Sequence, residues 1–337
     1  MQIKVSKEQL LTALEIVKPG LANKELIEQA TSFAFMGDRV VTYNDEISIS
    51  HPVSDMDITG AVKAEELYKL LGKLKGNDVH FEVTDAEVRI TAGKARAGIV
   101  LQQEIRLPLE ELGSISKWKR VPKNLKDALR FTMFSAAKDM SRPVLTCIHV
   151  TKNHVESCDN LRLTRYQLET ALPIADFLIP AAVVKDLVTY DFVAMAEGEG
   201  WVHFKTKAGT VFSSRIFEDE YPNVERLLDV SGEEFQLPAG MDEVLQRAEV
   251  FAKRPSVLDE QVVITLSPKT LLVRSEDTTG WFEEELKLEG GGPSEEFEFA
   301  INPGSLRDMY SRQPRCELST ERMKFAGDGW EHVVALL

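Results

Sequence analysis

Two kinds of apolar pattern alternate along the chain. In Val79–Val83 (VHFEV) and Trp201–Lys205 (WVHFK) the apolar residues fall on every second position, a pattern that predicts half-buried strands. The leucines of 67–74 are instead spaced i, i+3, i+4 and i+7, and the same spacing recurs in 241–252. This spacing predicts amphipathic helices. The chain should therefore consist of antiparallel strands and hairpins interrupted by short helices.

One block recurs six times: an extended apolar stretch, a helix start and an amphipathic helix. The predicted starts lie near Ser6, Lys63, Pro122, Pro180, Pro238 and Asn302. The intervals between them are 57, 59, 58, 58 and 64 residues. Proline at the first helical position loses no hydrogen bond, and serine or asparagine can cap the free amides of the first turn. A regular repeat over the whole chain indicates one structural unit used six times.

Taken two at a time, the six repeats give three domains. One helix with three or four strands per repeat makes a domain of about 115 residues, in which two helices pack on antiparallel sheet. Small and charged residues near Gly113–Ser116 and Asp229–Glu234 mark the joints. We therefore predict an α+β fold with domains at 1–114, 115–230 and 231–337.

The charge of the chain is unevenly distributed. The 337 residues have the hydrophobic content of a globular protein, 43%, but a formal net charge of −14, which argues against a surface coated with Lys and Arg for nucleic acid. The predicted helices differ: they hold 17 basic and 11 acidic residues, a net +6 that leaves −20 for the remainder. These counts cover 6–18, 63–75, 122–138, 180–191, 238–254 and 302–315.

Some of this positive charge forms stripes in the middle of helices. Lys126 and Arg130 are four residues apart on the face away from the leucines, and Lys69 and Lys73 repeat that spacing. Basic residues at helix ends have another explanation, because the helix dipole favours them there without any ligand. The mid-helix stripes favour a surface that attracts phosphates. We found no recognition-helix or zinc-finger pattern, so sequence-specific readout is not expected.

The chain carries no recognisable catalytic, metal or redox motif. GxxxxGK[ST], HExxH and GxSxG are absent from the sequence, and its six histidines never pair at the spacing of helical ligands. Cys147, Cys158 and Cys316 form no CxxC pair, so neither a disulfide framework nor a zinc knuckle is indicated. Asp159 and Arg162 have no nucleophile beside them and are interpreted as a structural ion pair. We expect no enzymatic activity, no metal and no cofactor.

The same sequence gives no indication of a membrane protein. No apolar stretch approaches the roughly 20 residues that span a bilayer. The opening residues, MQIKVSKEQL, lack the basic-then-apolar layout of a secretory signal. We therefore expect a cytoplasmic protein.

Four segments occur in the order in which one known family has them. They are Ile3–Leu11, Phe134–Leu145, Ser157–Leu163 with Asp159, Arg162 and Leu163 as the best match, and Ile216–Asn223 with its aromatic-Pro turn. Together with the apolar end Val333–Leu337, they resemble the DNA polymerase III beta subunit, the bacterial sliding clamp. The resemblance covers essentially the whole chain, which is identified as a divergent bacterial or phage member of that family.

The resemblance implies a fold, an assembly and a function. Two three-domain subunits would associate head to tail into a ring, with the helices lining a hole around duplex DNA. Such a clamp is a processivity factor without catalytic activity that is held on DNA by topology. It would be found in the cytoplasm, associated with the nucleoid and the replisome. It tethers DNA polymerase and is served by a clamp loader, both through short peptide motifs. The alternative is an acidic, strand-rich interaction scaffold that never binds DNA.

The resemblance also implies a peptide-binding pocket between the second and third domains. By residue match the pocket includes Arg142, Leu145, Cys158, Asn160, Leu161, Arg162, Leu163, Val333, Val334, Ala335, Leu336 and Leu337. Asn160 and Leu161 stand where the family usually has Gly-His, so partner specificity stays open. Simple core packing is an equal explanation for Leu163, Val333 and Val334.

Basic residues on helices and loops are the candidates for DNA contact. Lys24 matches a basic loop residue of the family, and Lys138 lies in the loop after the third helix. The full set that we expect to face DNA is Lys24, Lys69, Lys73, Lys126, Arg130, Lys138, Arg247 and Arg307. For the contact between subunits, the sequence offers only Ile99 and Leu286 as weak candidates.

Overall fold

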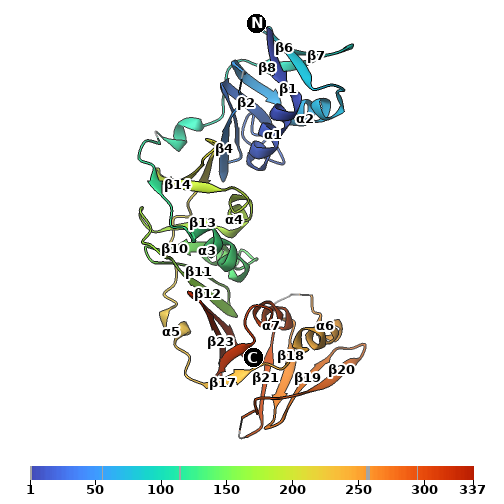
Figure 1. The fold of residues 1–337 in the computed structure, drawn as a ribbon, viewed down its shortest axis with the longest axis vertical. Helices are drawn as coiled ribbons and strands as arrows, with labels where there is room; N and C mark the ends of the chain where they lie inside the picture. The colour runs from blue at the N-terminus through green and yellow to red at the C-terminus, as the bar shows by residue number, and fades with distance from the viewer. Residues whose placement is uncertain (1, 55, 114, 256–258, 294) are drawn as a thin grey trace. The chain divides into compact units, whose positions relative to one another are not determined.

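Helices begin close to all six predicted starts in the computed structural model of the chain, which describes every residue except 1, 55, 114, 256–258 and 294 (Figure 1). Ser114, the predicted end of the first domain, thus lies outside the described residues. The six helices are α1 (Lys7–Val17), α2 (Ala64–Lys73), α3 (Leu125–Thr132), α4 (Ala181–Leu187), α6 (Met241–Ala252) and α7 (Pro303–Tyr310). A further short helix, α5 (Glu225–Leu228), was not predicted.

The first and last of these helices are capped as predicted. The Ser6 hydroxyl accepts a hydrogen bond from the Gln9 amide at 3.5 Å, and the Asn302 side chain accepts one from the Ser305 amide at 3.0 Å. Each cap satisfies an amide that has no partner within its helix. Pro180 lies at the N-cap of α4, directly before the first helical residue.

Two helices begin later than predicted. The third starts at Leu125, not at Pro122, and α6 starts at Met241, not at Pro238. Before α6 the chain makes a turn in which Gly240 adopts φ +84°, a left-handed conformation that glycine takes without strain. The Pro238 carbonyl, just before this turn, accepts a hydrogen bond from the Tyr310 hydroxyl at 3.1 Å.

The chain divides into two compact units, and the first consists of residues 1–123 and 172–218. Its antiparallel 12-stranded sheet has the order β1-β6-β7-β8-β5-β2-β3-β4-β16-β15-β14-β9. These strands are β1 (Gln2–Ser6), β2 (Ser32–Gly37), β3 (Arg39–Tyr43), β4 (Ile47–Pro52), β5 (Ile58–Lys63), β6 (Asp78–Val83), β7 (Glu87–Ala92), β8 (Ala95–Gln102), β9 (Lys119–Arg120), β14 (Phe192–Glu197), β15 (Trp201–Thr206) and β16 (Val211–Arg215). The unit also contains β13 (Phe177–Pro180).

The second unit consists of residues 124–171 and 219–337. One of its sheets runs β10-β11-β12-β24-β23-β22-β17, and a separate 4-stranded sheet has the order β20-β19-β18-β21. The strands are β10 (Cys147–Val150), β11 (His154–Cys158), β12 (Arg162–Gln167), β17 (Glu233–Gln236), β18 (Val262–Leu266), β19 (Thr270–Glu276), β20 (Trp281–Lys287), β21 (Phe297–Ile301), β22 (Arg315–Leu318), β23 (Arg322–Gly327) and β24 (Trp330–Ala335).

Each unit contains a strand pair that joins two of the predicted domains. In the first unit β4 pairs antiparallel with β16, and in the second β12 pairs antiparallel with β24. Hydrogen bonds therefore run without interruption across both predicted joints. The two units cut through the predicted second domain, and the division into three domains stays a prediction.

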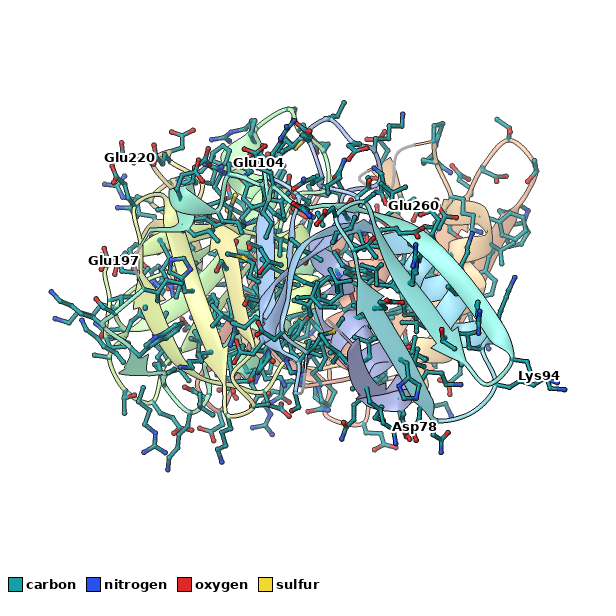
Figure 2. All side chains as sticks on the ribbon, turned by 90° about the horizontal axis from the view of Figure 1, so that it is seen from above. Asp78, Lys94, Glu104, Glu197, Glu220 and Glu260 are labelled. Atoms are coloured by element: carbon teal, nitrogen blue, oxygen red, sulfur yellow. The ribbon has the colours of Figure 1, made fainter. Side chains whose placement is uncertain are left out.

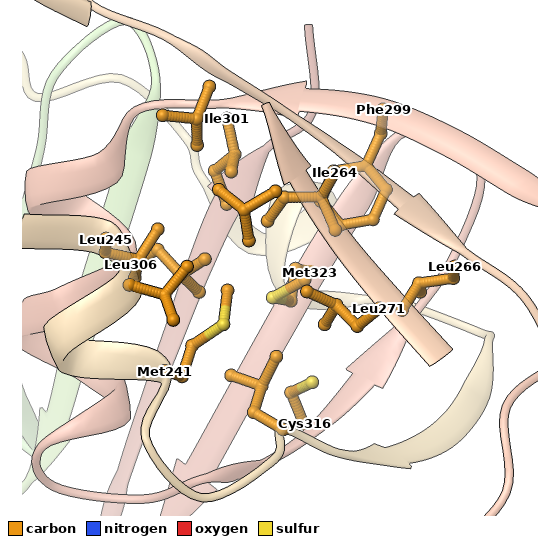
Figure 3. Packing of buried hydrophobic residues seen from close by; sticks show 14 of the residues in the cluster. Met241, Leu245, Ile264, Leu266, Leu271, Phe299, Ile301, Leu306, Cys316 and Met323 are labelled. Atoms are coloured by element: carbon orange, nitrogen blue, oxygen red, sulfur yellow. The ribbon is translucent and has the colours of Figure 1, made fainter. Parts of the chain in front are cut away.

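Helices α6 and α7 cover one face of the strands in the second unit. Met241 and Leu245 of α6 and Leu306 of α7 point toward Leu271 and Met323 of the strands (Figure 3). All five side chains are fully buried. Packing apolar helix faces on antiparallel sheet is the architecture of an α+β fold, which confirms the predicted fold class.

Candidate partner-binding and DNA-facing sites

Four residues of the predicted pocket pack together in the second unit. Leu163 of β12 lies opposite Val333 of β24 in the sheet, and both contact a cluster that includes Leu145 and Cys158. These four side chains are at most 4% exposed. We call this group the junction cluster; it comprises Leu145, Cys158, Leu163, Val224, Leu228, Val230 and Val333.

A segment of chain covers the junction cluster. This segment, Tyr221–Leu228, includes α5, and we call it the strap. The Tyr221 hydroxyl accepts a hydrogen bond from the Cys158 amide at 2.9 Å and lies 3.3 Å from the Cys158 sulfur. Burial raises the pKa of the Cys158 thiol and that of the Tyr221 hydroxyl. Both groups are therefore neutral hydrogen-bonding partners at physiological pH.

The other residues of the predicted pocket differ in exposure. Val334 is buried in the core beneath α6 and α7, and Leu336 packs against that core. The Ala335 amide donates to the Leu161 carbonyl at 2.7 Å, which holds the end of β24 beside the β11–β12 turn. The surface of the set is formed by exposed and half-buried residues: Arg142, Asn160, Leu161, Arg162, Ala335 and Leu337. A partner would meet these residues first.

Asp159 and Arg162 form the structural ion pair expected from the sequence. Arg162 Nε lies 3.0 Å from one carboxylate oxygen of Asp159, and the other oxygen accepts the Leu161 and Arg162 amides at 2.8 and 2.9 Å. The Arg162 guanidinium also lies 5.4 Å from the centre of the Phe134 ring. These contacts fix the turn between β11 and β12.

The eight predicted DNA-facing cations are not equivalent. Lys24, Lys73 and Lys138 are exposed, and we find no carboxylate within ion-pair distance of them in the described part of the chain. Lys69 forms an ion pair with Glu65, and Arg130 lies 3.6 Å from Asp127. Lys126 is half-buried. The three exposed lysines are the best placed to attract phosphate.

The two arginines from the last predicted domain are held by carboxylates of their own chain. Arg247 makes a bidentate ion pair with Glu284, with both N–O distances 2.9 Å. Arg307 lies 2.9 Å from Asp242 and 2.8 Å from Glu249. Their charge is largely compensated, which weakens the case for them as phosphate contacts.

Sequence reasoning missed a charged network in the sheet beside the junction cluster. Glu156, 4% exposed, contacts Arg165 at 2.7 and 2.9 Å and His149 at 3.0 Å. Burial alone would raise the pKa of Glu156, but hydrogen bonds from the two nearby histidines, His149 and His154, and the charge of Arg165 hold that pKa well below its usual range. The only sequence signal was a glutamate and an arginine within strand patterns.

Two further findings bear on the class of protein. Among the described residues, we find no group of three or more His, Cys, Asp or Glu side chains arranged to hold a metal ion. Nor is any helix in the described part of the chain both long and apolar enough to cross a membrane.

Comparisons with known proteins agree on one family name. No family model matches the chain. The beta sliding clamp of Streptococcus pneumoniae is 24% identical over 252 residues, 66% of this chain and 66% of that protein. The beta sliding clamp of Lactococcus lactis is 24% identical over 257 residues, 68% and 67% of the two chains. The match thus spans about two thirds of these relatives.

The fold extends over the full chain. The DNA polymerase III beta subunit of Pseudomonas aeruginosa superposes with a TM-score of 0.86 over 100% of both chains, at 18% sequence identity. That of Bacillus subtilis gives the same TM-score and identity, over 100% of this chain and 99% of the other. Both helices and strands therefore follow the clamp arrangement from end to end.

Proposed function

We propose that the chain is a divergent member of the bacterial sliding clamp family and acts as a DNA sliding clamp. It would encircle duplex DNA, move along it without reading the bases, and tether the replicative polymerase in the cytoplasm, at the nucleoid. The role is a processivity factor and requires no catalytic group, metal or cofactor. The observation that carries the proposal is the strand pairing at the joints between predicted domains.

Both joints use the same strand of the repeat. At each one the third strand of a first repeat pairs with the third strand of a second repeat: β4 with β16, and β12 with β24. In the described part of the chain, two strands of this kind have no such partner: β20, at the edge of its sheet, and β8, which pairs with β5 only at Leu101 and Gln102 and leaves residues 95–100 open on that side. Edge strands with unsatisfied backbone groups tend to pair with another chain. Pairing β20 of one copy with β8 of another gives a head-to-tail assembly that two copies can close.

The repeat also defines the β20 residue at this contact. Trp281 is the first residue of β20 to pair across its hairpin, as Leu163 is in β12 and Ser48 in β4. At the two internal joints, Leu163 pairs with Val333 and Ser48 with Ser213. Trp281 should therefore lie opposite the β8 residue that is equivalent to Val333.

That residue of β8 is Gly98. Val333 is the third residue after Trp330, which closes the β23–β24 hairpin, and Gly98 is the third after Ala95, which closes the β7–β8 hairpin. The same register places Glu283 opposite Arg96. It also brings Glu285 near Lys94, which Figure 2 shows at the outer end of the β7–β8 hairpin. The acidic strand β20 thus pairs with the basic start of β8.

The surfaces of the two strands fit this pairing. Trp281 is 69% exposed. On the first unit, a hollow of about 710 Å³ is lined by Gly98 and its neighbours Arg89, Thr91 and Arg96. A large aromatic side chain can cover a glycine on the facing strand. With this register, Trp281 takes the place of Leu286, a weak sequence candidate, as the β20 residue at the contact between subunits. Ile99, the other weak candidate, lies next to Gly98 in β8.

DNA and protein partners would use different parts of the molecule. We propose that Lys24, Lys73 and Lys138 supply most of the uncompensated charge for sequence-independent contact with phosphates, and that Lys69, Lys126 and Arg130 contribute less. Short peptides of the polymerase and the clamp loader would bind at the rim of the junction cluster, between Arg142, Asn160 and the chain end. An apolar floor with a few polar groups at its rim suits such peptides.

The test is retention on DNA. The purified chain is loaded by its clamp loader and ATP on a nicked circle, and bound protein is measured before and after the circle is cut once. Retention on the circle and loss from the linear product is the expected result. Equal retention would indicate ordinary electrostatic binding, and no retention with a competent loader would favour the acidic scaffold.

A further inference from the structure

The strap is attached to the sheet by polar contacts at three places. At its start, the Tyr221 hydroxyl bonds the Cys158 amide at 2.9 Å. At α5, Glu225 lies 2.8 Å from Arg165. At its end, two residues of β23 donate to strap carbonyls: Arg322 Nη1 to Arg226 at 3.3 Å and Lys324 Nζ to Leu228 at 2.9 Å. These contacts orient the strap in a way that apolar packing alone would not, because hydrogen bonds depend on direction and apolar contacts do not.

Two of these contacts, those of Tyr221 and Glu225, depend on one buried carboxylate. Glu156 binds Arg165 through Nε and Nη2, at 2.9 and 2.7 Å, which leaves Nη1 of the same guanidinium to bind Glu225 of the strap. Glu156 also contacts His149 at 3.0 Å, and the His149 ring lies 4.9 Å from the Tyr221 ring. The carboxylate therefore supports the strap both at its first residue and at α5.

The strap lies where it can influence binding at the junction cluster. Leu228 points inward and is part of that cluster, whereas the adjacent Leu227 is 40% exposed. On the sheet, Glu156 and Cys158 are two residues apart in β11, so their side chains lie on the same face. A shift of the strap would thus uncover Cys158 and move Leu227 together.

We propose that Glu156 is a positioning residue for the partner-binding site: through Arg165 and His149 it holds the strap against the junction cluster, so that the strap forms one wall of the site and Leu227 an apolar contact for the partner peptide. This inference rests on the proposed function. Glu156 itself does not contact the partner, since its side chain is buried beneath the network.

Three variants separate this role from general stability. Glu156→Gln removes the charge that binds Arg165 and changes the contact to His149. Glu225→Gln removes only the exposed carboxylate at α5, whose side chain is 64% accessible, and is not expected to endanger the fold. Glu321→Gln changes an exposed glutamate in the β22–β23 turn of the same unit and is the matched control.

The first measurement is the alkylation rate of each cysteine by iodoacetamide, resolved by mass spectrometry. Cys158 lies under the strap, whereas Cys316 is buried elsewhere in the same unit and reports general unfolding. We expect Glu156→Gln to speed Cys158 alkylation by about ten-fold, since opening a local segment requires less free energy than global unfolding. Glu225→Gln should act in the same direction but less, and Cys316 should keep its rate in both.

The second measurement separates partner contact from ring closure. We expect Glu156→Gln to slow loading onto nicked circles at limiting clamp loader, by several-fold, while the lifetime of the loaded protein on the circle equals that of Glu321→Gln. A structural defect in the ring would shorten that lifetime as well. The split between loading and lifetime therefore identifies a role in positioning the partner site.

Each outcome of these two measurements either supports or overturns the role of Glu156. Unchanged Cys158 alkylation in both variants, or faster alkylation with normal loading, would overturn the inference. If Glu156→Gln also exposes Cys316, Glu225→Gln decides: a selective effect on Cys158 with slow loading supports the role, and no effect refutes it. Failure of the wild-type chain to remain on circles would instead refute the proposed function, while the cysteine rates would still report whether Glu156 holds the strap.

Discussion

Arg307 of α7 lies 2.8 Å from Glu249 of α6, and the Arg307 Nε lies 2.9 Å from Asp242, also of α6. Two carboxylates thus surround one guanidinium on the helices that we expect to face DNA. Hydrogen bonding to Arg307 lowers the pKa of Asp242, so both partners stay charged at physiological pH. This cation is compensated within its own chain.

Removing the two carboxylates should release that charge. We expect Asp242→Asn with Glu249→Gln to strengthen binding to a short linear duplex at low salt by several-fold, with a steeper dependence on salt concentration. Fluorescence anisotropy with a labelled duplex measures the affinity and its dependence on salt. Glu298→Gln, on strand β21, is the control and should leave binding unchanged. Equal affinities in all three proteins would mean that Arg307 does not face DNA.

The three exposed lysines should act in the opposite direction. Lys73→Gln with Lys138→Gln is expected to weaken binding to the linear duplex and to reduce the slope of log affinity against log salt by about 2, roughly one per lost phosphate contact. Retention on a closed circle should persist, because topology and not affinity would hold the ring. Loss of retention on the circle would show that charge, not encirclement, keeps the protein on DNA.

Trp281 is expected to be the main apolar contact between subunits. Replacing it with alanine should raise the dissociation constant of the dimer by about thirty-fold, the effect expected of an aromatic residue at the centre of an interface. Analytical ultracentrifugation over a concentration series measures the constant. Val250→Ala, which shortens another exposed apolar side chain, is the control. A dimer unaffected by Trp281→Ala would disprove the deduced register.

The charges beside Trp281 offer an independent test of the same register. Within one chain, Glu283 contacts Arg274 at 2.6 Å. We expect Glu283→Arg or Arg96→Glu alone to weaken the dimer by about ten-fold, because like charges would face each other. The double variant restores opposite charges and should recover most of the affinity. If the double variant is as weak as the two single losses combined, the two residues are not opposite.

His332 should make the second unit sensitive to acid. Burial, together with the nearby Arg162 and Arg312, lowers the pKa of this histidine to about 3. The unfolded chain takes up a proton as the pH falls through about 6.5 and the folded chain does not, so stability is lost from there downward. We expect the loss between pH 7.5 and 5 to be about 2 kcal/mol smaller in His332→Leu. Urea unfolding at the two pH values, followed by hydrogen exchange in β24, measures this loss of stability. Equal losses in the wild-type chain and in His332→Leu would contradict the prediction.

Local patterns sufficed to predict much of the fold. Ser6 and Asn302 are helix caps because a side chain of that type bonds an amide three residues away, and Leu67 and Leu71 face the core because helical geometry places them on one side. The ordered segments also gave the resemblance to the sliding clamp. These features depend on residues that are near one another in sequence.

Only the tertiary structure decided which charges meet. Arg247 and Glu284 are 37 residues apart, and Glu156 and Arg165 are joined by the pairing of β11 with β12, so their compensation cannot be read from a count of basic residues in helices. The register of Leu163 against Val333 likewise depends on strands from distant parts of the chain. Sequence alone therefore determined the repeats and the family resemblance. Long-range pairing decided which lysines stay uncompensated, how the strap is held, and which stretches of β8 and β20 have an unpaired side.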